Sequence, residues 1–344
     1  MLSDTLLFVG GCSGSFAAPT ENRPVFDADS PHQVRHVPFS RQKFGSRTSS
    51  YFLRHRDTWI VIDQGLGIEP ISEFVIDMLQ AERIENPVVH LLQTHYHEDH
   101  IEGLRANALM FQRGTTLRFY SPRLQARAST RLFTHDETSP TSSCPLDPCM
   151  MDVLEAEFCK SYWPVTLDLL DRTGATREHV EFQTGDTLQI DDVVVRTTWL
   201  PHPGECVGYR FEFAQSDPIV IATDHEPAVE VNTSIVDFFD GAGLLLADMQ
   251  YRQAEYDGTM AIGRRSENCM SREGWGHGTP ELLFPYIEKT SQRPKKLRIV
   301  HHDPKRSDED LQSFHEESHD ILKRYLGDDS IDYGFAADGE LYWL

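Results

Sequence analysis

Four potential metal ligands follow directly on one apolar run of the sequence. They are His95, His97, Asp99 and His100. Alternate side chains of an extended segment share a side, so His95 and His97 are expected to face the same way. Asp99 and His100 lie where we expect the chain to turn into a helix near Ile101. Neutral imidazoles and a carboxylate suit zinc, and manganese or iron accept the same ligands, so this loop could serve two divalent cations.

Further residues of the same ligand types follow later apolar runs. His202, Asp224 and the pair His301 and His302 each come directly after a predicted strand. Open α/β sheets place their sites at the ends of strands. We therefore expect these side chains to join the histidine-rich loop in one metal centre.

The elements that must position these residues are visible as alternating short apolar runs and helical spacings. Strands are predicted where β-branched and apolar residues are closed by turns, and helices where apolar residues recur every three or four positions. The predicted strands cover residues 6–10, 50–53, 59–62, 88–92, 186–190, 193–200, 207–213, 218–223, 244–248 and 296–300. The predicted helices cover residues 71–79 and 234–239 and a last stretch after 307. The two halves look architecturally alike, which indicates a mixed α/β fold.

Length, charge and cysteine content narrow the class of protein. The chain has 344 residues, enough for one large α/β domain over residues 1–344. Its net charge of −22 repels phosphate backbones, so no polymeric nucleic acid is expected as a partner. Six cysteines without a CxxC pair indicate reduced thiols in the cytoplasm. No apolar run approaches the roughly 20 residues of a membrane helix, so no membrane association is expected.

One segment does not follow the alternating pattern. Between residues 125 and 180 the sequence is rich in Thr, Ser and Pro and carries three of the cysteines. We interpret residues 125–180 as an insertion or lid within the domain.

The ligand pattern resembles that of the metallo-β-lactamase superfamily. The motif His95-x-His97-x-Asp99-His100, followed by His202, Asp224 and His301, carries the resemblance. It implies an α/β fold, a four-layer αββα sandwich, here with an inserted segment. Residues 10–15, 44–50 and 62–65 resemble the phosphodiesterase branch, which includes ribonuclease Z and cyclic-phosphate hydrolases, and residues 248–251, 274–279 and 301–304 resemble a bacterial subgroup of it.

The resemblance implies a division of the ligands between two metal ions. One ion would be held by His95, His97 and His202, the other by Asp99, His100 and His301, with Asp224 bridging them and a hydroxide between the ions. His301 is favoured over His302 because it is the first residue past the strand. A carboxylate replaces His97 in the flavodiiron branch, so this chain looks hydrolytic rather than redox-active.

The resemblance also nominates an acid–base pair. His277 corresponds to the general acid of the ribonuclease Z motif, and Asp248 would orient its imidazole, so His277, Asp248 and Asp99 are the candidate catalytic residues. The family pattern has Ser where this chain has Gly278.

Four residues are candidate substrate contacts. His302 would lie beside the metal ligands, and Arg47 stands where the subgroup has Asn and could contact a phosphate. Tyr162 and Trp163, in the predicted insertion, could stack on a nucleobase, although core packing is the role favoured for them.

These residues support one principal function and three alternatives. The principal expectation is a metal-dependent phosphodiesterase that hydrolyses a cyclic nucleotide or cyclic dinucleotide. The alternatives are a thioester or lactone hydrolase, a transfer-RNA 3′-processing nuclease, which the negative charge opposes, and a non-catalytic nucleotide-binding protein. Members of the branch often dimerise, so a homodimer is also an expectation.

Overall fold

Two seven-stranded sheets form the frame of the molecule. The computed structural model describes residues 4–19, 23–26, 34–37, 40–123, 149–262 and 269–344. The first sheet has the order β16-β1-β4-β5-β6-β7-β8 and the second the order β15-β14-β13-β12-β11-β10-β9. The strands of the first sheet are β1 (Thr5–Gly11), β4 (Ser50–His55), β5 (Thr58–Ile62), β6 (Val88–Leu92), β7 (Thr116–Pro122), β8 (Thr176–Phe182) and β16 (Leu341–Trp343). Those of the second are β9 (Thr187–Ile190), β10 (Val193–Leu200), β11 (Cys206–Glu212), β12 (Ile219–Ala222), β13 (Leu244–Asp248), β14 (Lys296–Val300) and β15 (Asp332–Phe335).

The two sheets repeat the same pairing pattern. In each sheet, four neighbouring strands pair antiparallel, and the other three strands continue the sheet in parallel pairs. The pairing changes from antiparallel to parallel at β5 in the first sheet and at β12 in the second. The predicted likeness of the two halves is therefore a likeness of topology.

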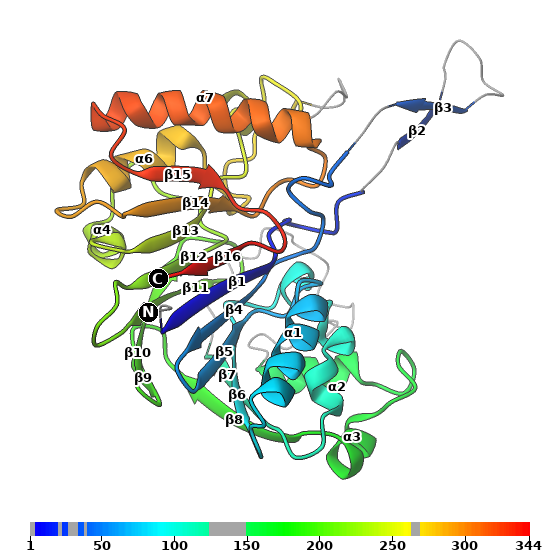
Figure 1. Cartoon of the computed structure of the whole chain (residues 1–344). Helices are drawn as coiled ribbons and strands as arrows, with labels where there is room; N and C mark the ends of the chain where they lie inside the picture. The colour runs from blue at the N-terminus through cyan, green and yellow to red at the C-terminus, as the bar shows by residue number, and fades with distance from the viewer. Residues whose placement is uncertain (1–3, 20–22, 27–33, 38–39, 124–148, 263–268) are drawn as a thin grey trace, which may run out of the picture.

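Helices cover the outer face of each sheet (Figure 1). The helices beside the first sheet are α1 (Ile68–Ala81), α2 (Met150–Glu157) and α3 (Leu167–Thr173), with short 3₁₀ helices η1 (Glu98–His100), η2 (Leu104–Ala106) and η3 (Ala108–Phe111). Beside the second sheet lie α4 (Thr233–Phe239), α6 (Pro280–Glu288) and α7 (Asp308–Leu326), and the short α5 (Gln253–Tyr256) follows β13. Three apolar cores separate the layers, one between the sheets and one beneath each helical layer. The predicted four-layer αββα sandwich is confirmed.

The outer helices form where apolar periodicity and capping agree. In α1, Ile71, Val75 and Leu79 recur every four residues and are buried. In α7, the side chain of Ser307 caps the first turn by accepting from Asp310 N, and Gly327 ends the helix in the left-handed conformation.

The strands direct their carboxyl ends to one edge of the sandwich. β6 runs parallel to β5 and β7, and β12, β13 and β14 run parallel to one another. The candidate ligands follow these ends, because each chain segment leaves its sheet at that edge.

Some local structure differs from the sequence prediction. The helix expected near Ile101 is replaced by the three short 3₁₀ helices, whose hydrogen bonds close tighter turns than an α-helix. A hairpin of β2 (Arg23–Phe26) and β3 (Val34–Val37) extends away from the body and was not predicted (Figure 1).

The predicted insertion of residues 125–180 lies only partly within the described residues. Residues 125–148 lie outside them, whereas α2 and α3 contribute to the core beneath the first sheet. β8 begins inside the predicted segment and pairs with β7 at the edge of that sheet. Among the described residues, no helix is long and apolar enough to span a membrane.

Candidate metal centre and acid–base pair

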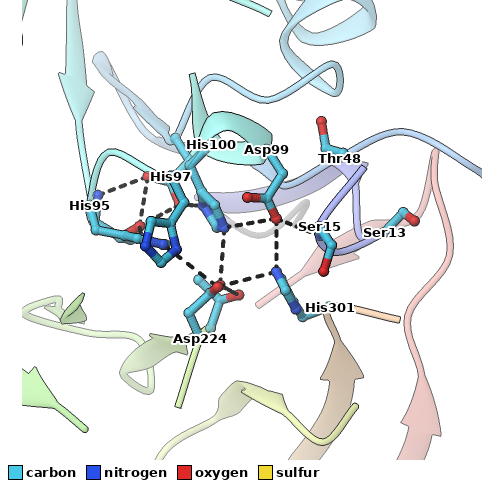
Figure 2. Close-up of polar contacts among 12 residues, drawn as sticks. Ser13, Ser15, Thr48, His95, His97, Asp99, His100, Asp224 and His301 are labelled. Carbon is cyan, nitrogen blue, oxygen red and sulfur yellow. Dashed lines mark hydrogen bonds and ion pairs between the residues drawn. The ribbon is translucent and has the colours of Figure 1, made fainter. Parts of the chain in front are cut away.

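Seven side chains form two groups of potential metal ligands at the common strand edge. In the first, ligand atoms of His95, His97, His202 and Asp224 all lie within 4.8 Å of one another. The second group, with the same spacing, is Asp99, His100, Asp224 and His301. Asp224 belongs to both groups, and Figure 2 shows it between the loop that follows β6 and His301. The structure therefore brings together all seven predicted ligands.

Asp224 is surrounded by four imidazoles. Its Oδ2 lies 3.7 Å from the Nε2 atoms of both His95 and His202. The same oxygen is 3.2 Å from His301 Nε2, and Oδ1 is 3.1 Å from His100 Nε2. One carboxylate in this position can bridge two cations.

Within the described part of the chain, the ligand nitrogen of His95 has no hydrogen-bond partner, and it lies 3.7 Å from Asp224 Oδ2. The ligand nitrogen of His100 faces carboxylate oxygens of Asp224 and Asp99, at 3.1 and 3.6 Å. Buried polar atoms in native proteins are almost always satisfied, so unpaired atoms in a ligand cluster indicate a missing partner. Imidazole nitrogens beside carboxylate oxygens are a donor set that zinc accepts, and the residues therefore fit a divalent metal centre.

The opposite ring nitrogens of the ligand histidines are held by the protein. His100 Nδ1 lies 2.8 Å from Asp63 Oδ2, and His202 Nδ1 lies 2.9 Å from the Gly276 carbonyl oxygen. His95 Nδ1 lies 3.0 Å from the hydroxyl of Thr94. Such contacts orient the rings and fix which nitrogen remains available for a metal.

Asp63 organises the loop without being a ligand. Its carboxylate accepts from Thr94 N and Oγ1 and from Gln93 Nε2, besides contacting His100. Its backbone and that of Asp224 and His301 adopt positive φ, at 57°, 52° and 62°. Strained backbone of this kind persists where surrounding contacts enforce it, as at functional sites.

The electrostatics of the cluster separate two kinds of histidine. Burial lowers the pKa of His97 and His202 to about 4 and that of His95 well below its usual value. Burial also acts to lower the pKa of His100, but Asp224 and the neighbouring carboxylates outweigh it and raise that pKa well above 6.5. The proton on His100 thus supplies positive charge that a cation would otherwise provide, and metal binding is expected to release it.

A second pair of side chains lies against the ligands. His277 Nδ1 is 2.6 Å from Asp248 Oδ2, and the two side chains are buried. The His277 ring stacks on His301 with centroids 4.6 Å apart and lies 5.3 Å from the ring of His202. Asp248, His277 and His301 also form a third group of potential ligands. Burial lowers the pKa of His277 and raises that of Asp248 well above its usual value, so both shifts favour neutral forms.

Two glycines explain the sequence around His277. Gly276 has a φ of +95°, and a Cβ added there would lie 2.1 Å from His202 Nδ1, so no side chain fits. A Cβ at Gly278 would lie 2.9 Å from Pro227 Cδ. The Ser expected from the resemblance therefore has no room here unless Pro227 shifts.

The first of the four predicted substrate contacts, His302, is buried beside Phe335. His302 is 2% exposed, stacks on Phe335 and contacts the Ala336 carbonyl oxygen at 2.9 Å. His302 thus packs against β15 and the residue that follows it, and its predicted contact with substrate stays a prediction.

The other three predicted contacts lie among different neighbours. Arg47 forms an ion pair with Glu69 at 3.7 Å, and Tyr162 is 74% exposed. Trp163 packs against the core beneath the first sheet, with the guanidinium of Arg105 5.8 Å from its ring. Their roles toward substrate stay predictions.

Sequence reasoning missed several residues that support the centre. Ser15 donates its backbone N–H to Asp99 at 2.7 Å (Figure 2), and Gln250 contacts His301 Nδ1 at 3.1 Å. Glu226 contacts the turn before His277. Gln250 lies in a segment that the resemblance had marked, whereas the Ser15 contact uses a backbone donor that no sequence pattern reveals.

Comparison with known proteins agrees with the fold and the loop. The model of the metallo-beta-lactamase superfamily matches residues 45–109, which include the histidine-rich loop. The metallo-beta-lactamase fold protein YhfI from Bacillus subtilis is 15% identical, with 98% of each chain covered and a TM-score of 0.57. Yeast PDE1 is 13% identical, with both chains fully covered and a TM-score of 0.59. Human tRNase Z, short form, is 13% identical, with 98% of each chain covered and a TM-score of 0.54.

No curated protein is similar enough in sequence to match the chain. The structural likeness nevertheless extends over nearly the whole length, and the sequence match falls on the loop that supplies four of the ligands. The chain therefore has the metallo-β-lactamase fold, with the superfamily's sequence pattern in residues 45–109.

Proposed function

We propose that the protein is a metal-dependent phosphodiesterase that hydrolyses a small cyclic nucleotide or cyclic dinucleotide. The observation that carries the proposal is the buried pair of His277 and Asp248, stacked directly on the ligand His301. A proton donor beside a dinuclear centre suits reactions in which an alkoxide leaves.

Two divalent cations, zinc first and manganese or iron as alternatives, would lower the pKa of a water molecule and offset the negative charge of the phosphoryl group. His95, His97 and His202 would hold one cation, and Asp99, His100 and His301 the other. Asp224, with imidazoles on every side of its carboxylate, would serve both.

The chain's own acid–base pair accounts for the proton. Before the reaction the pair carries two protons. One lies between Asp248 Oδ2 and His277 Nδ1, where the atoms are 2.6 Å apart, and the other is on His277 Nε2. The second proton passes to the leaving oxygen as its bond to phosphorus breaks. Asp248 keeps Nδ1 occupied, which leaves Nε2 as the nitrogen that meets the substrate.

The charge of the protein supports a small substrate. The net charge of −22 opposes accumulation of a polyanion such as transfer RNA near the surface. A single cyclic phosphate requires only local contacts at the centre. A homodimer remains an expectation for this protein.

The first experiment is a turnover panel with zinc- or manganese-loaded protein. The panel contains cyclic mononucleotides, cyclic dinucleotides, a lactone and a thioester, with Asp99→Ala as the control. We expect many turnovers of a cyclic phosphate and none with the control. Turnover of the lactone or thioester alone, or stoichiometric nucleotide binding without turnover, would refute the proposal.

The acid role is tested by His277→Ala. We expect the rate with an alkoxide leaving group to fall by about 10²–10⁴-fold, the usual contribution of a positioned general acid. Bis(p-nitrophenyl) phosphate, whose leaving group needs no proton, should lose far less. An equal loss with both substrates would contradict the role.

A further inference from the structure

We propose that Glu226 is a positioning residue that fixes both the metal ligand His202 and the acid His277. It does so by holding the turn of residues 274–276 that precedes His277. The part of this inference that concerns His277 rests on the proposed function, whereas the part that concerns His202 rests on the ligand geometry alone.

The carboxylate of Glu226 accepts from three donors, two in the turn of residues 274–276 and one at the end of α5. Its Oε2 accepts from Gly276 N at 2.6 Å, and its Oε1 accepts from Gly274 N at 2.7 Å and from the Tyr256 hydroxyl at 2.6 Å. Hydrogen bonds to an ionised acceptor are shorter and stronger than neutral ones. One side chain thereby defines the path of the turn.

The backbone of Glu226 ties this turn to the neighbouring strand end. Glu226 N donates to the carbonyl oxygen of Pro201 at 2.8 Å, directly before His202. Glu226 also follows Asp224 by two residues. It therefore connects the segments that carry His202, Asp224 and His277.

Gly276 connects Glu226 to His202 through its two backbone polar groups. While Gly276 N donates to Glu226, its carbonyl oxygen contacts His202 Nδ1 at 2.9 Å. This contact leaves His202 Nε2 facing Asp224 and His97. Removing the anchor of Gly276 should loosen the His202 ring and, through the next peptide, the His277 ring.

A glutamine cannot reproduce these contacts. Its side chain has one acceptor oxygen, and its NH₂ group would face a donor where Glu226 offers a second oxygen. Glu226→Gln keeps the size of the residue and removes the charge. Glu230, four positions further on, is exposed, so Glu230→Gln is a control with the same chemical change.

The experiment uses the full chain with both variants. Zinc is titrated into metal-free protein by calorimetry, and cobalt(II) is added separately so that its visible absorption reports the ligand geometry. Hydrolysis rates are then compared for bis(p-nitrophenyl) phosphate and for a cyclic nucleotide that the unmodified protein hydrolyses. His277→Ala and the double variant Glu226→Gln/His277→Ala complete the set.

We expect Glu226→Gln to weaken zinc binding by about 10–100-fold, the usual effect of removing support from a metal ligand, and to change the cobalt spectrum. The variant should change kcat by a larger factor than KM. The decrease in kcat should be larger for the cyclic nucleotide than for bis(p-nitrophenyl) phosphate. Adding Glu226→Gln to His277→Ala should lower the cyclic-nucleotide rate only by the factor that Glu226→Gln causes for the aryl ester, because the effect through His202 remains and the effect through His277 is already lost. Glu230→Gln should match the unmodified protein throughout.

Unchanged zinc affinity, cobalt spectrum and rate ratio in Glu226→Gln would overturn the inference. If Glu226→Gln does not fold, Glu226→Asp decides, because its carboxylate is one methylene too short for all three donors and a fully unchanged variant would refute the role. If the unmodified protein hydrolyses no phosphodiester, the proposed function fails, and the zinc and cobalt measurements still decide whether Glu226 positions His202.

Discussion

In two different parts of this molecule, buried histidines lie beside aspartates. One is the metal centre described above. The other, which we call the hairpin clasp, consists of His55 and His90 of the first sheet and Asp191 and Asp192 in the turn between β9 and β10. His90 Nε2 lies 3.3 Å from Asp191 Oδ2, and His55 Nε2 lies 3.6 Å from Asp192 Oδ2.

The two groups differ in whether their nitrogens are satisfied. In the hairpin clasp the other ring nitrogens also have partners, with His55 Nδ1 2.7 Å from Thr5 Oγ1 and His90 Nδ1 3.1 Å from the Tyr120 hydroxyl. In the metal centre, His95 Nε2 has no hydrogen-bond partner within the described residues. Burial of a histidine beside a carboxylate is therefore common to both groups, and the unsatisfied nitrogen of His95 is the feature that the hairpin clasp lacks.

The carboxylates also differ in exposure. The side chains of Asp191 and Asp192 are about half exposed, so burial outweighs their attraction and lowers the pKa of His90 and His55. Asp224 is buried, and with its neighbours it raises the pKa of His100 despite burial. Among these three histidines, only His100, whose neighbouring acid is buried, has a raised pKa.

The largest expected effect comes from removing the shared carboxylate. Asp224→Ala should abolish binding of both metal ions and all turnover, because Asp224 contacts ligands of both groups. Asp191→Ala removes a carboxylate from the hairpin clasp and should leave metal content unchanged. Metal analysis of the two purified variants checks this, and loss of metal from Asp191→Ala would erase the distinction between the two regions.

An intermediate effect is expected from chelation. At free zinc concentrations about 100-fold above the dissociation constant, binding should raise the free energy of unfolding by about 2.7 kcal/mol. Urea unfolding with zinc and with chelator measures the difference. His90→Gln should lower the free energy of unfolding both with zinc and with chelator, so the gain on zinc binding should stay the same. A smaller gain would show that the two regions are coupled.

The smallest effect concerns acid. The unfolded chain protonates His90 near its usual pKa of 6.5, whereas burial lowers that pKa in the folded state. The unfolded state then binds more protons, so the free energy of unfolding decreases as pH falls below about 6.5. The total decrease is about 1.4 kcal/mol for each unit by which folding lowers the pKa of His90. Metal-free His90→Gln should lose less stability than the unmodified protein between about pH 7.5 and pH 5.5 in urea titrations. If both proteins lost the same free energy of unfolding, residues other than His90 would be responsible for the acid sensitivity.

The fold and the ligands were readable because their signals are local. His95, His97, Asp99 and His100 fall within six consecutive positions, and His202, Asp224 and His301 each follow an apolar strand. Strand ends are where backbone leaves a sheet, so a ligand type at that point needs no knowledge of distant contacts.

The remaining features depend on contacts between distant segments. Glu226 acts on backbone N–H groups, which every residue carries, so no side-chain pattern announces it. The hairpin clasp joins His90 to Asp191 across the two sheets, and its histidines look no different from ligands in the sequence. The orientation of His302 was not readable from the sequence, because it is set by packing on Phe335.

The order of synthesis gives the spread of the ligands a further meaning. Asp99 and His301, whose side chains meet in the finished centre, are 202 positions apart. At about 5–20 residues per second, a ribosome needs roughly 10–40 seconds to cover that distance. Throughout this interval the second ligand group, Asp99, His100, Asp224 and His301, lacks at least His301. A site completed this late would take the cation that is available once His301 is made, so metal supply as well as affinity would govern its selectivity.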